Sequence, residues 1–145
     1  MQKRFYVDSC IYLNLWQKEW NENLGKPYWE IAKEFFERVE TEDSIVYYSG
    51  YLLKELSFIL EKNFFNKKLP MFNFSPNFKR ISLSINEYNL ARKIEKETNY
   101  ETSFYDIIHM LLAKKTRSIF ITRDNKLIEI SKRYNVVVKR PEELL

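Results

Sequence analysis

One stretch decides the fold of this chain: residues 103–127, SFYDIIHMLLAKKTRSIFITRDNKL. Its first half is apolar at nearly every position from Ile107 onward, which is typical of a buried helix. Ser103 is a suitable N-cap for that helix, and Asp106 then stands in the first helical turn. Because a carboxylate on a buried helix needs a partner, Asp106 is the first candidate site residue.

The second half of the stretch predicts a buried strand. After a basic break at residues 114–117, residues 118–122, SIFIT, form a continuous run of strand type. Asp124 stands just past the end of this run. In parallel α/β sheets, ligands bind beyond the carboxyl ends of the strands. Asp124 is therefore the second candidate site residue. Acids that follow other strands of the same sheet would lie close to it at the carboxyl ends of the strands.

The composition bounds the class of protein. The 145 residues suffice for one domain, residues 1–145, with a buried core. Lys and Arg number 24 against 20 for Asp and Glu, a net charge of +4 that permits a nucleic-acid partner without requiring one. The single cysteine, Cys10, excludes an internal disulfide and a cysteine-based zinc cage. No apolar run approaches ~20 residues and the N-terminus lacks a signal peptide's apolar core, so we expect a soluble, cytoplasmic protein without a membrane partner.

Strand and helix patterns alternate along the chain. This alternation predicts an α/β fold with a mostly parallel sheet and helices on both faces. The segment 63–78 mixes aromatic residues with lysines and prolines, and it is either an exposed surface for a partner or a nucleic acid, or a loop folded onto the core. Five strands are expected, at about residues 4–8, 45–49, 79–83, 118–122 and 136–138.

Two further acids occupy positions like that of Asp124. Asp8 ends the first predicted strand, although an aspartate there can also simply cap the next helix. Glu55 lies at the edge of an apolar helical stripe, in the first turns after the second strand. A lone glutamate on a helix is more often a solvated residue, so the position after the strand is what makes Glu55 a candidate.

The four acids Asp8, Glu55, Asp106 and Asp124 can all meet at one carboxyl edge of the sheet. Carboxylates that lie close together repel one another, and a divalent cation would balance their charge. Mg²⁺ and Mn²⁺ prefer oxygen ligands, and the chain offers no Cys or His set suited to zinc. Such ions support the cleavage of phosphodiester bonds.

Basic residues stand close to two of these acids in the sequence. Arg117, Arg123 and Lys126 are predicted to hold phosphates at the rim of the site. Acids at the centre with cations at the rim suit a polyanion, and single-stranded or looped RNA enters a groove more readily than a stiff duplex. The sequence therefore favours metal-dependent cleavage of RNA.

Four motifs, each containing one of the acids, carry a family resemblance: FYVDS, YLLKEL, SFYDIIHMLLAKK and IFITRD. In this order they resemble the PIN domain, in particular the VapC-type toxin ribonucleases, over residues 7–138. The resemblance implies a three-layer α/β/α sandwich and an endoribonuclease dependent on Mg²⁺ or Mn²⁺. It makes the four acids the catalytic and metal-binding residues, with Ser9 and Thr122 in support. It also implies a type II toxin with a protein antitoxin, and a homodimer.

The chain departs from the family pattern at two positions. Cys10 stands where many members have Asn, and Lys126 stands where many have a further acid. We interpret Cys10 as a packed residue and His109 as a structural one rather than an acid or base. Two other functions stay open: a PIN-fold module that binds RNA or a protein without cleaving, and a phosphotransfer enzyme on a similar sheet.

Overall fold

The centre of the structure is a five-stranded sheet in which every neighbouring pair of strands runs parallel. The computed structural model describes residues 2–18, 22–23 and 25–145. The predicted α/β class and the five strands are confirmed. The last strand starts later than predicted, because the N–H of Val136 still closes the preceding helix by donating to the Ser131 carbonyl at 2.9 Å. In the order β5-β4-β1-β6-β7, the strands are Phe78–Arg80, Ile45–Tyr48, Arg4–Val7, Ile119–Ile121 and Val138–Lys139.

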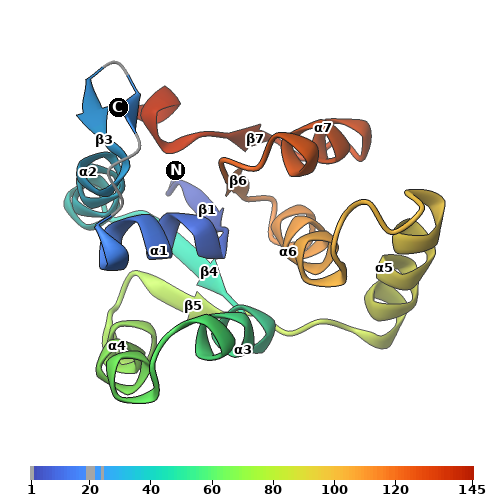
Figure 1. The fold of residues 1–145 in the computed structure, drawn as a ribbon, viewed down its shortest axis with the longest axis horizontal. Helices are drawn as coiled ribbons and strands as arrows, with labels where there is room; N and C mark the ends of the chain where they lie inside the picture. Colours follow the sequence, from blue (N-terminus) through green and yellow to red (C-terminus); the bar gives the residue numbers. More distant parts are fainter. Residues whose placement is uncertain (1, 19–21, 24) are drawn as a thin grey trace.

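Helices cover both faces of this sheet, as the predicted α/β/α sandwich requires (Figure 1). A short hairpin joins β2 Glu22–Asn23 to β3 Lys26–Pro27, and a 3₁₀ turn, η1 Pro141–Leu144, follows the last strand. Within the described residues, no helix combines the length and the apolar character that a bilayer crossing requires. The helices are α1 Ser9–Gln17, α2 Tyr28–Thr41, α3 Gly50–Ile59, α4 Lys62–Phe74, α5 Ile85–Glu97, α6 Phe104–Lys115 and α7 Asn125–Arg133.

Alternation along β1 divides the interior into two apolar cores. Phe5 and Val7 belong to the core under α1 to α4, whereas Tyr6 belongs to the core under α5 to α7. Residues 107–113 of α6 are all buried, as predicted for this helix. The predicted N-cap is also confirmed, since Ser103 Oγ accepts the N–H of the third helical residue at 3.2 Å. Packing on every side therefore fixes the polar residues that α6 carries.

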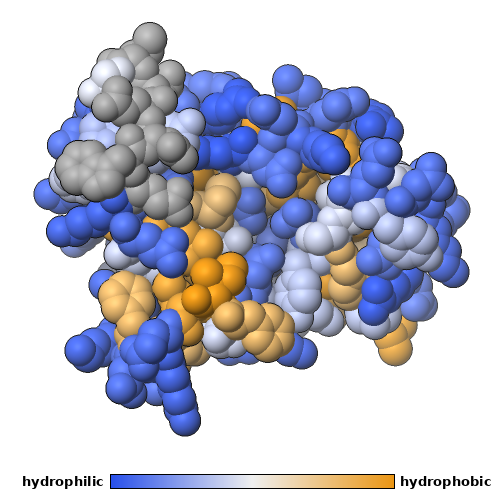
Figure 2. Space-filling model, viewed as in Figure 1, coloured by the Kyte–Doolittle hydropathy of each residue, from blue (hydrophilic) through white to orange (hydrophobic). Residues whose placement is uncertain are grey.

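The aromatic segment 63–78 is mostly helical. Phe72 of α4 is buried, and Phe64 and Phe65 pack against the same core. Phe74 at the end of α4 is 82% exposed, and Phe58 on α3 is 70% exposed. Figure 2 shows hydrophobic side chains gathering over α1, α3 and α4. The segment therefore packs onto the core as a helix rather than as the predicted loop, and its use as a partner or nucleic-acid surface stays a prediction.

The strand order reverses beside β1. From β1 the chain builds outward to β4 and β5, and it then returns to the other side of β1 as β6 (Figure 1). In open α/β sheets, ligands bind at the carboxyl ends of the strands at such a switch point. Asp8 follows β1 and Asp124 follows β6. The topology therefore brings these two strand ends to the position where a site is expected.

Candidate functional site

Asp8 lies at the centre of the carboxyl edge of the sheet. Its N–H donates to the Ile121 carbonyl of β6 at 2.9 Å, which extends the parallel pairing by one residue. The side chain is 4% exposed and caps α1 by accepting the N–H of Ser9 at 2.8 Å. Asp8 can therefore cap α1 and belong to the candidate site at the same time. Burial raises the pKa of Asp8, so the charged form needs compensation from its neighbours.

Two side chains hold one oxygen of the Asp8 carboxylate. Thr122 is fully buried just after β6, and its hydroxyl donates to Asp8 Oδ2 at 2.8 Å. Cys10 Sγ lies 3.4 Å from the same oxygen, and burial keeps the pKa of Cys10 well above its usual range. Cys10 is therefore a neutral thiol packed against Asp8, which fits its interpretation as a packed residue.

Glu55 is held by a histidine that the sequence analysis treated as structural. His109 of α6 is fully buried, and its Nε2 donates to Glu55 Oε1 at 3.1 Å. Its Nδ1 lies 2.8 Å from Tyr6 Oη, which lies 2.7 Å from Ser49 Oγ. Ser49 is the N-cap of α3, the helix that carries Glu55. A ring of hydrogen-bonded side chains from β1, α3 and α6 thus fixes the Glu55 carboxylate.

The electrostatics indicate that this ring is charged. Burial opposes the ionisation of both partners, yet the hydrogen bond from His109 leaves the pKa of Glu55 lowered. Burial likewise lowers the pKa of His109, but the bond to Glu55 and the charge of Asp8 raise it overall. Both directions favour an imidazolium, which donates at both nitrogens and finds acceptors on Glu55 and Tyr6. The sequence signal for this role was that His109 follows Asp106 by one turn on the same helical face.

Asp106 lies half-buried in the first turn of α6, beside the same group. Burial and the charge of Asp8 raise the pKa of Asp106 to about 7, against the opposing charge of His109. One ligand atom each from Asp8, Glu55 and His109 lie within 4.8 Å of one another. Two of the four predicted acids, Asp8 and Glu55, thus belong to this group, and Asp106 is coupled to both of them electrostatically.

Asp124 lies at the same edge but apart from this group. Its carboxylate is exposed and caps α7 by accepting the N–H groups of Lys126 at 2.9 Å and Leu127 at 3.2 Å. Its own N–H donates at 3.2 Å to the Thr122 hydroxyl, the group that also holds Asp8. The structure therefore leaves Asp124 at the rim, joined to the other acids through Thr122.

Arg117 does not lie beside the acids, and its predicted place at the rim is wrong. It is in the turn before β6, whereas Asp124 follows that strand, so the two are at opposite edges of the sheet. Arg4, the first residue of β1, donates to the Thr116 carbonyl in this turn at 3.3 Å. Residues close together in the sequence were separated because a strand runs between them.

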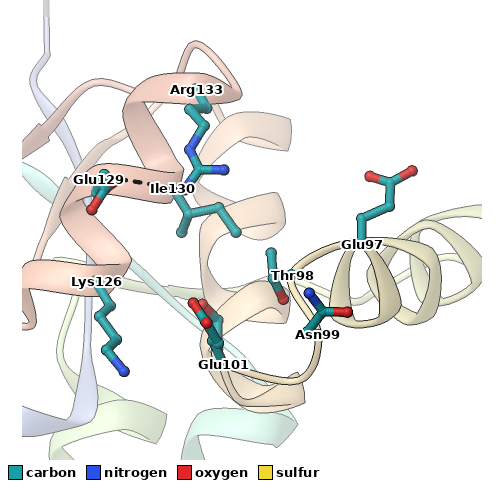
Figure 3. A pocket seen from close by; sticks show the side chains of 9 residues that line it. Glu97, Thr98, Asn99, Glu101, Lys126, Glu129, Ile130 and Arg133 are labelled. Carbon is teal, nitrogen blue, oxygen red and sulfur yellow. Dashed lines mark hydrogen bonds and ion pairs between the residues drawn. The ribbon is translucent and has the colours of Figure 1, made fainter.

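Arg123 and Lys126 follow β6 on the expected side. Arg123 is mostly buried, pairs with Glu142 of η1 at 2.9 Å, and has its guanidinium carbon 3.7 Å from the Tyr28 ring centroid, so it is committed to folded contacts. Lys126 is exposed at a cavity of about 280 Å³ lined by α7 and the connection between α5 and α6. Figure 3 shows that glutamates, Glu129 among them, share this cavity with Lys126. Lys126 stays a predicted phosphate contact, in a mixed rather than a basic environment.

Solved structures share this fold. The chain is similar to VapBC2 from Rickettsia felis bound to a promoter DNA fragment, with a TM-score of 0.66 at 13% identity, covering 94% of this chain and 98% of that chain. It is also similar to VapC20 from Mycobacterium tuberculosis, described as a toxin that cleaves the sarcin–ricin loop, with a TM-score of 0.65 at 15% identity over 87% and 94% of the two chains. FitAcB from Neisseria gonorrhoeae matches with a TM-score of 0.59 at 16% identity over 95% and 98%. At these identities the likeness establishes the fold alone.

Sequence comparison settles the family. A search of curated proteins found no match. The family model of the PIN domain matches residues 5–133, which include all the candidate acids. Since this match covers most of the chain and the solved structures that share its fold include VapC toxins, the chain belongs to the PIN domain family.

Proposed function

We propose that this chain is an endoribonuclease dependent on Mg²⁺ or Mn²⁺ and the toxin of a type II toxin–antitoxin pair. The observation that carries the proposal is the gathering of acids at the switch point of the sheet: Asp8 and Glu55 offer ligand atoms within 4.8 Å of each other, and burial together with both of their charges raises the pKa of Asp106. Burial and mutual repulsion raise the pKa of Asp8 and bring that of Asp106 to about 7. Acids whose charged forms are disfavoured in this way suit a site that receives a cation.

The donor set fits a hard divalent cation. Asp8 and Glu55 offer carboxylate oxygens within 4.8 Å of each other, and Asp8 Oδ1 accepts one N–H bond and keeps further lone-pair capacity. Mg²⁺ and Mn²⁺ prefer oxygen ligands, and both ring nitrogens of His109 already have hydrogen-bond partners, Glu55 and Tyr6. We therefore assign Asp8, Glu55 and Asp106 as ligands, with Asp124 as the fourth acid at the rim.

The residues around the acids have positioning roles in this proposal. A bound divalent ion supplies an activated water and stabilises the leaving oxygen of a phosphodiester. Thr122 holds Asp8, and the Ser9 hydroxyl and His109 both favour the ionised form of Glu55. Because burial and the charge of Asp8 raise the pKa of Asp106 to about 7 in the metal-free protein, this carboxyl group has to give up a proton to bind an ion.

The proposed substrate is single-stranded or looped RNA, which the VapC20 relative is described as cleaving in the form of the sarcin–ricin loop. VapC-type toxins are usually paired with a protein antitoxin and often form homodimers, and we propose both partners for this chain. The exposed Phe58 and Phe74 offer apolar surface for such contacts. In this proposal residues 1–145 form one domain, and the enzyme cleaves RNA in the cytoplasm.

The test is cleavage of a structured RNA pool by the purified chain with Mg²⁺, with Mn²⁺ or with a chelator. We expect cleavage that is lost on chelation and in Asp8→Asn with its fold intact by circular dichroism. Glu40→Gln, which changes an exposed acid of α2, is the matched control and should retain full activity. RNA binding that is identical with and without metal, together with no cleavage of any RNA, would contradict the enzyme and support a module that binds RNA without cutting it.

A further inference from the structure

A second cavity at the carboxyl edge lies next to the helix that carries Glu55. Its volume is about 420 Å³, and Gly50, Tyr51 and Lys54 of α3 face Arg80 and the residues that follow β5. Arg80 pairs with Tyr48 in the β4–β5 ladder, and both are the last residues of their strands. The cavity therefore opens on the same edge of the sheet as the acidic group, on the side away from Asp124.

This cavity is basic, and the contact that holds one of its cations within the fold is weak, because Lys54 Nζ lies 5.9 Å from the Phe58 ring centroid. Lys54 and Arg80 are both exposed, and among the residues that the structure describes neither makes an ion pair. Arg123, by contrast, is held by Glu142 at 2.9 Å. Cations without a carboxylate partner beside a groove are suited to an anionic ligand.

Gly50 allows Arg80 to lie on the first turn of α3. A Cβ at position 50 would be only 2.9 Å from a guanidinium nitrogen of Arg80, closer than real side chains approach. The first-turn N–H groups of a helix have no partners inside it, and the helix dipole favours an anion there. The guanidinium and the start of α3 thus face the same space, and an alanine at position 50 would displace the flexible end of Arg80 from it.

Aromatic side chains connect this cavity to the acids. The ring of Tyr51, which lines the cavity, contacts the ring of Tyr105 edge-on with centroids 6.0 Å apart. Tyr105 directly precedes Asp106 on α6. Tyrosine rings between a basic cavity and a cleavage site are platforms on which unpaired bases stack.

We propose that the cavity between α3 and β5 binds a backbone phosphate of single-stranded RNA adjacent to the scissile bond, through Lys54 and Arg80. This inference rests on the ribonuclease function proposed above. It identifies the cavity as the place that the RNA strand enters on leaving the acidic group. An RNA strand fits better than an acidic protein segment, because the cavity is joined to the acidic group by stacking surfaces rather than by apolar side chains alone. The sequence analysis placed the phosphate contacts on the β6 side only.

The experiment measures RNA binding in the full chain carrying Asp8→Asn, so that cleavage does not intervene. Fluorescence anisotropy with a labelled single-stranded RNA gives the affinity as a function of salt concentration. Lys54→Ala with Arg80→Ala should lower the affinity at least tenfold and reduce the salt slope by about 0.7, the value for one phosphate contact on a single strand. The matched control, Lys132→Ala with Arg38→Ala, removes one Lys and one Arg from last helical turns and should leave the slope unchanged.

Gly50→Ala provides a second variant that keeps every charge. It should weaken binding by displacing the Arg80 guanidinium, while the fold and the melting temperature hold. An unchanged salt slope in the Lys54 and Arg80 variant, or an equal loss in the control, would overturn the proposal. Tighter binding of a poly-glutamate peptide than of RNA through the same two residues would also overturn it, in favour of an acidic protein partner. Metal-dependent cleavage by the chain without these changes is scored separately, so failure of the cavity and failure of the ribonuclease are distinguishable.

Discussion

Replacing Asp106 by asparagine should stabilise the metal-free protein, and the gain should depend on pH. Asp106 lies half-buried beside Asp8 and Glu55, and these surroundings raise its pKa from the ordinary 3.8 to about 7. A carboxyl group whose pKa is higher in the folded than in the unfolded protein binds its proton more tightly when folded, so it supports folding at low pH. Its contribution is complete below about pH 4 and is lost as the pH rises through about 7.

The size of the effect follows from this interval. At about 1.4 kcal/mol per pH unit, the step from 3.8 to about 7 corresponds to roughly 4 kcal/mol of unfolding free energy lost at pH 8. Because the side chain is partly exposed, solvent screening reduces this, and we expect about 2–4 kcal/mol. For a domain of this size that is roughly 5–12 °C in melting temperature. Asparagine carries no charge at any pH, so the Asp106→Asn variant should recover this amount.

Thermal and urea unfolding in chelator, at pH 5 and pH 8, measure the gain. Asp106→Asn should exceed the unchanged protein in stability at pH 8 and show only a little over a third of that gain at pH 5, where the folded protein still holds the Asp106 proton but the unfolded chain has lost it. Asp124→Asn is the matched control, because asparagine keeps the N-cap of α7 and the residue lies apart from the acidic group. Equal gains at both pH values, or none at pH 8, would refute the ionisation of Asp106 against its neighbours. With Mn²⁺ present the order should reverse, because binding of the ion stabilises only the protein that retains all its ligands.

Three other variants test the contacts around the acids. Glu55→Gln should abolish RNA cleavage and lower the stability by about 1–3 kcal/mol in urea unfolding, because it breaks a charge-assisted bond to His109. Tyr6→Phe should lower the stability by about 1–2 kcal/mol and reduce kcat for RNA more than it changes KM, since it removes the hydroxyl that joins His109 to the α3 cap. Arg123→Ala should lower the melting temperature by removing the pair with Glu142, and a changed salt slope of RNA binding would contradict its assignment to folded contacts.

The position of the acids could be predicted because topology acts on local patterns. Asp8 and Asp124 directly follow strands, and parallel strands bring their carboxyl ends to one edge. Asp106 lies in the first turn of α6 and Glu55 in the second turn of α3, so strand ends and early helix turns indicated the edge of the sheet at which each acid lies. The sequence pattern could not predict how deeply each acid is buried. An acid that contacts the other site residues and an acid at the rim have the same local sequence signal.

The polar contacts between elements could not be predicted from local sequence. Fifty-four positions separate His109 from Glu55, and only the packing of α6 against α3 shows that they touch. Arg117 was misplaced because closeness to an acid in sequence does not say at which end of a strand a residue lies. The ion pair of Arg123 could not be predicted because its partner, Glu142, comes from the end of the chain.

The charge of the site explains how its acids coexist before a cation binds. Asp8, Glu55 and Asp106 are three carboxylates around one buried His109, and an imidazolium there offsets one negative charge. The raised pKa of Asp106 means that a proton offsets a second charge at neutral pH. His109 is tied into the fold by Glu55 and Tyr6, whereas the proton on Asp106 is exchangeable. We therefore expect a divalent cation at the proposed site to compete with the proton on Asp106 rather than with the His109 ring, whose hydrogen bond positions Glu55.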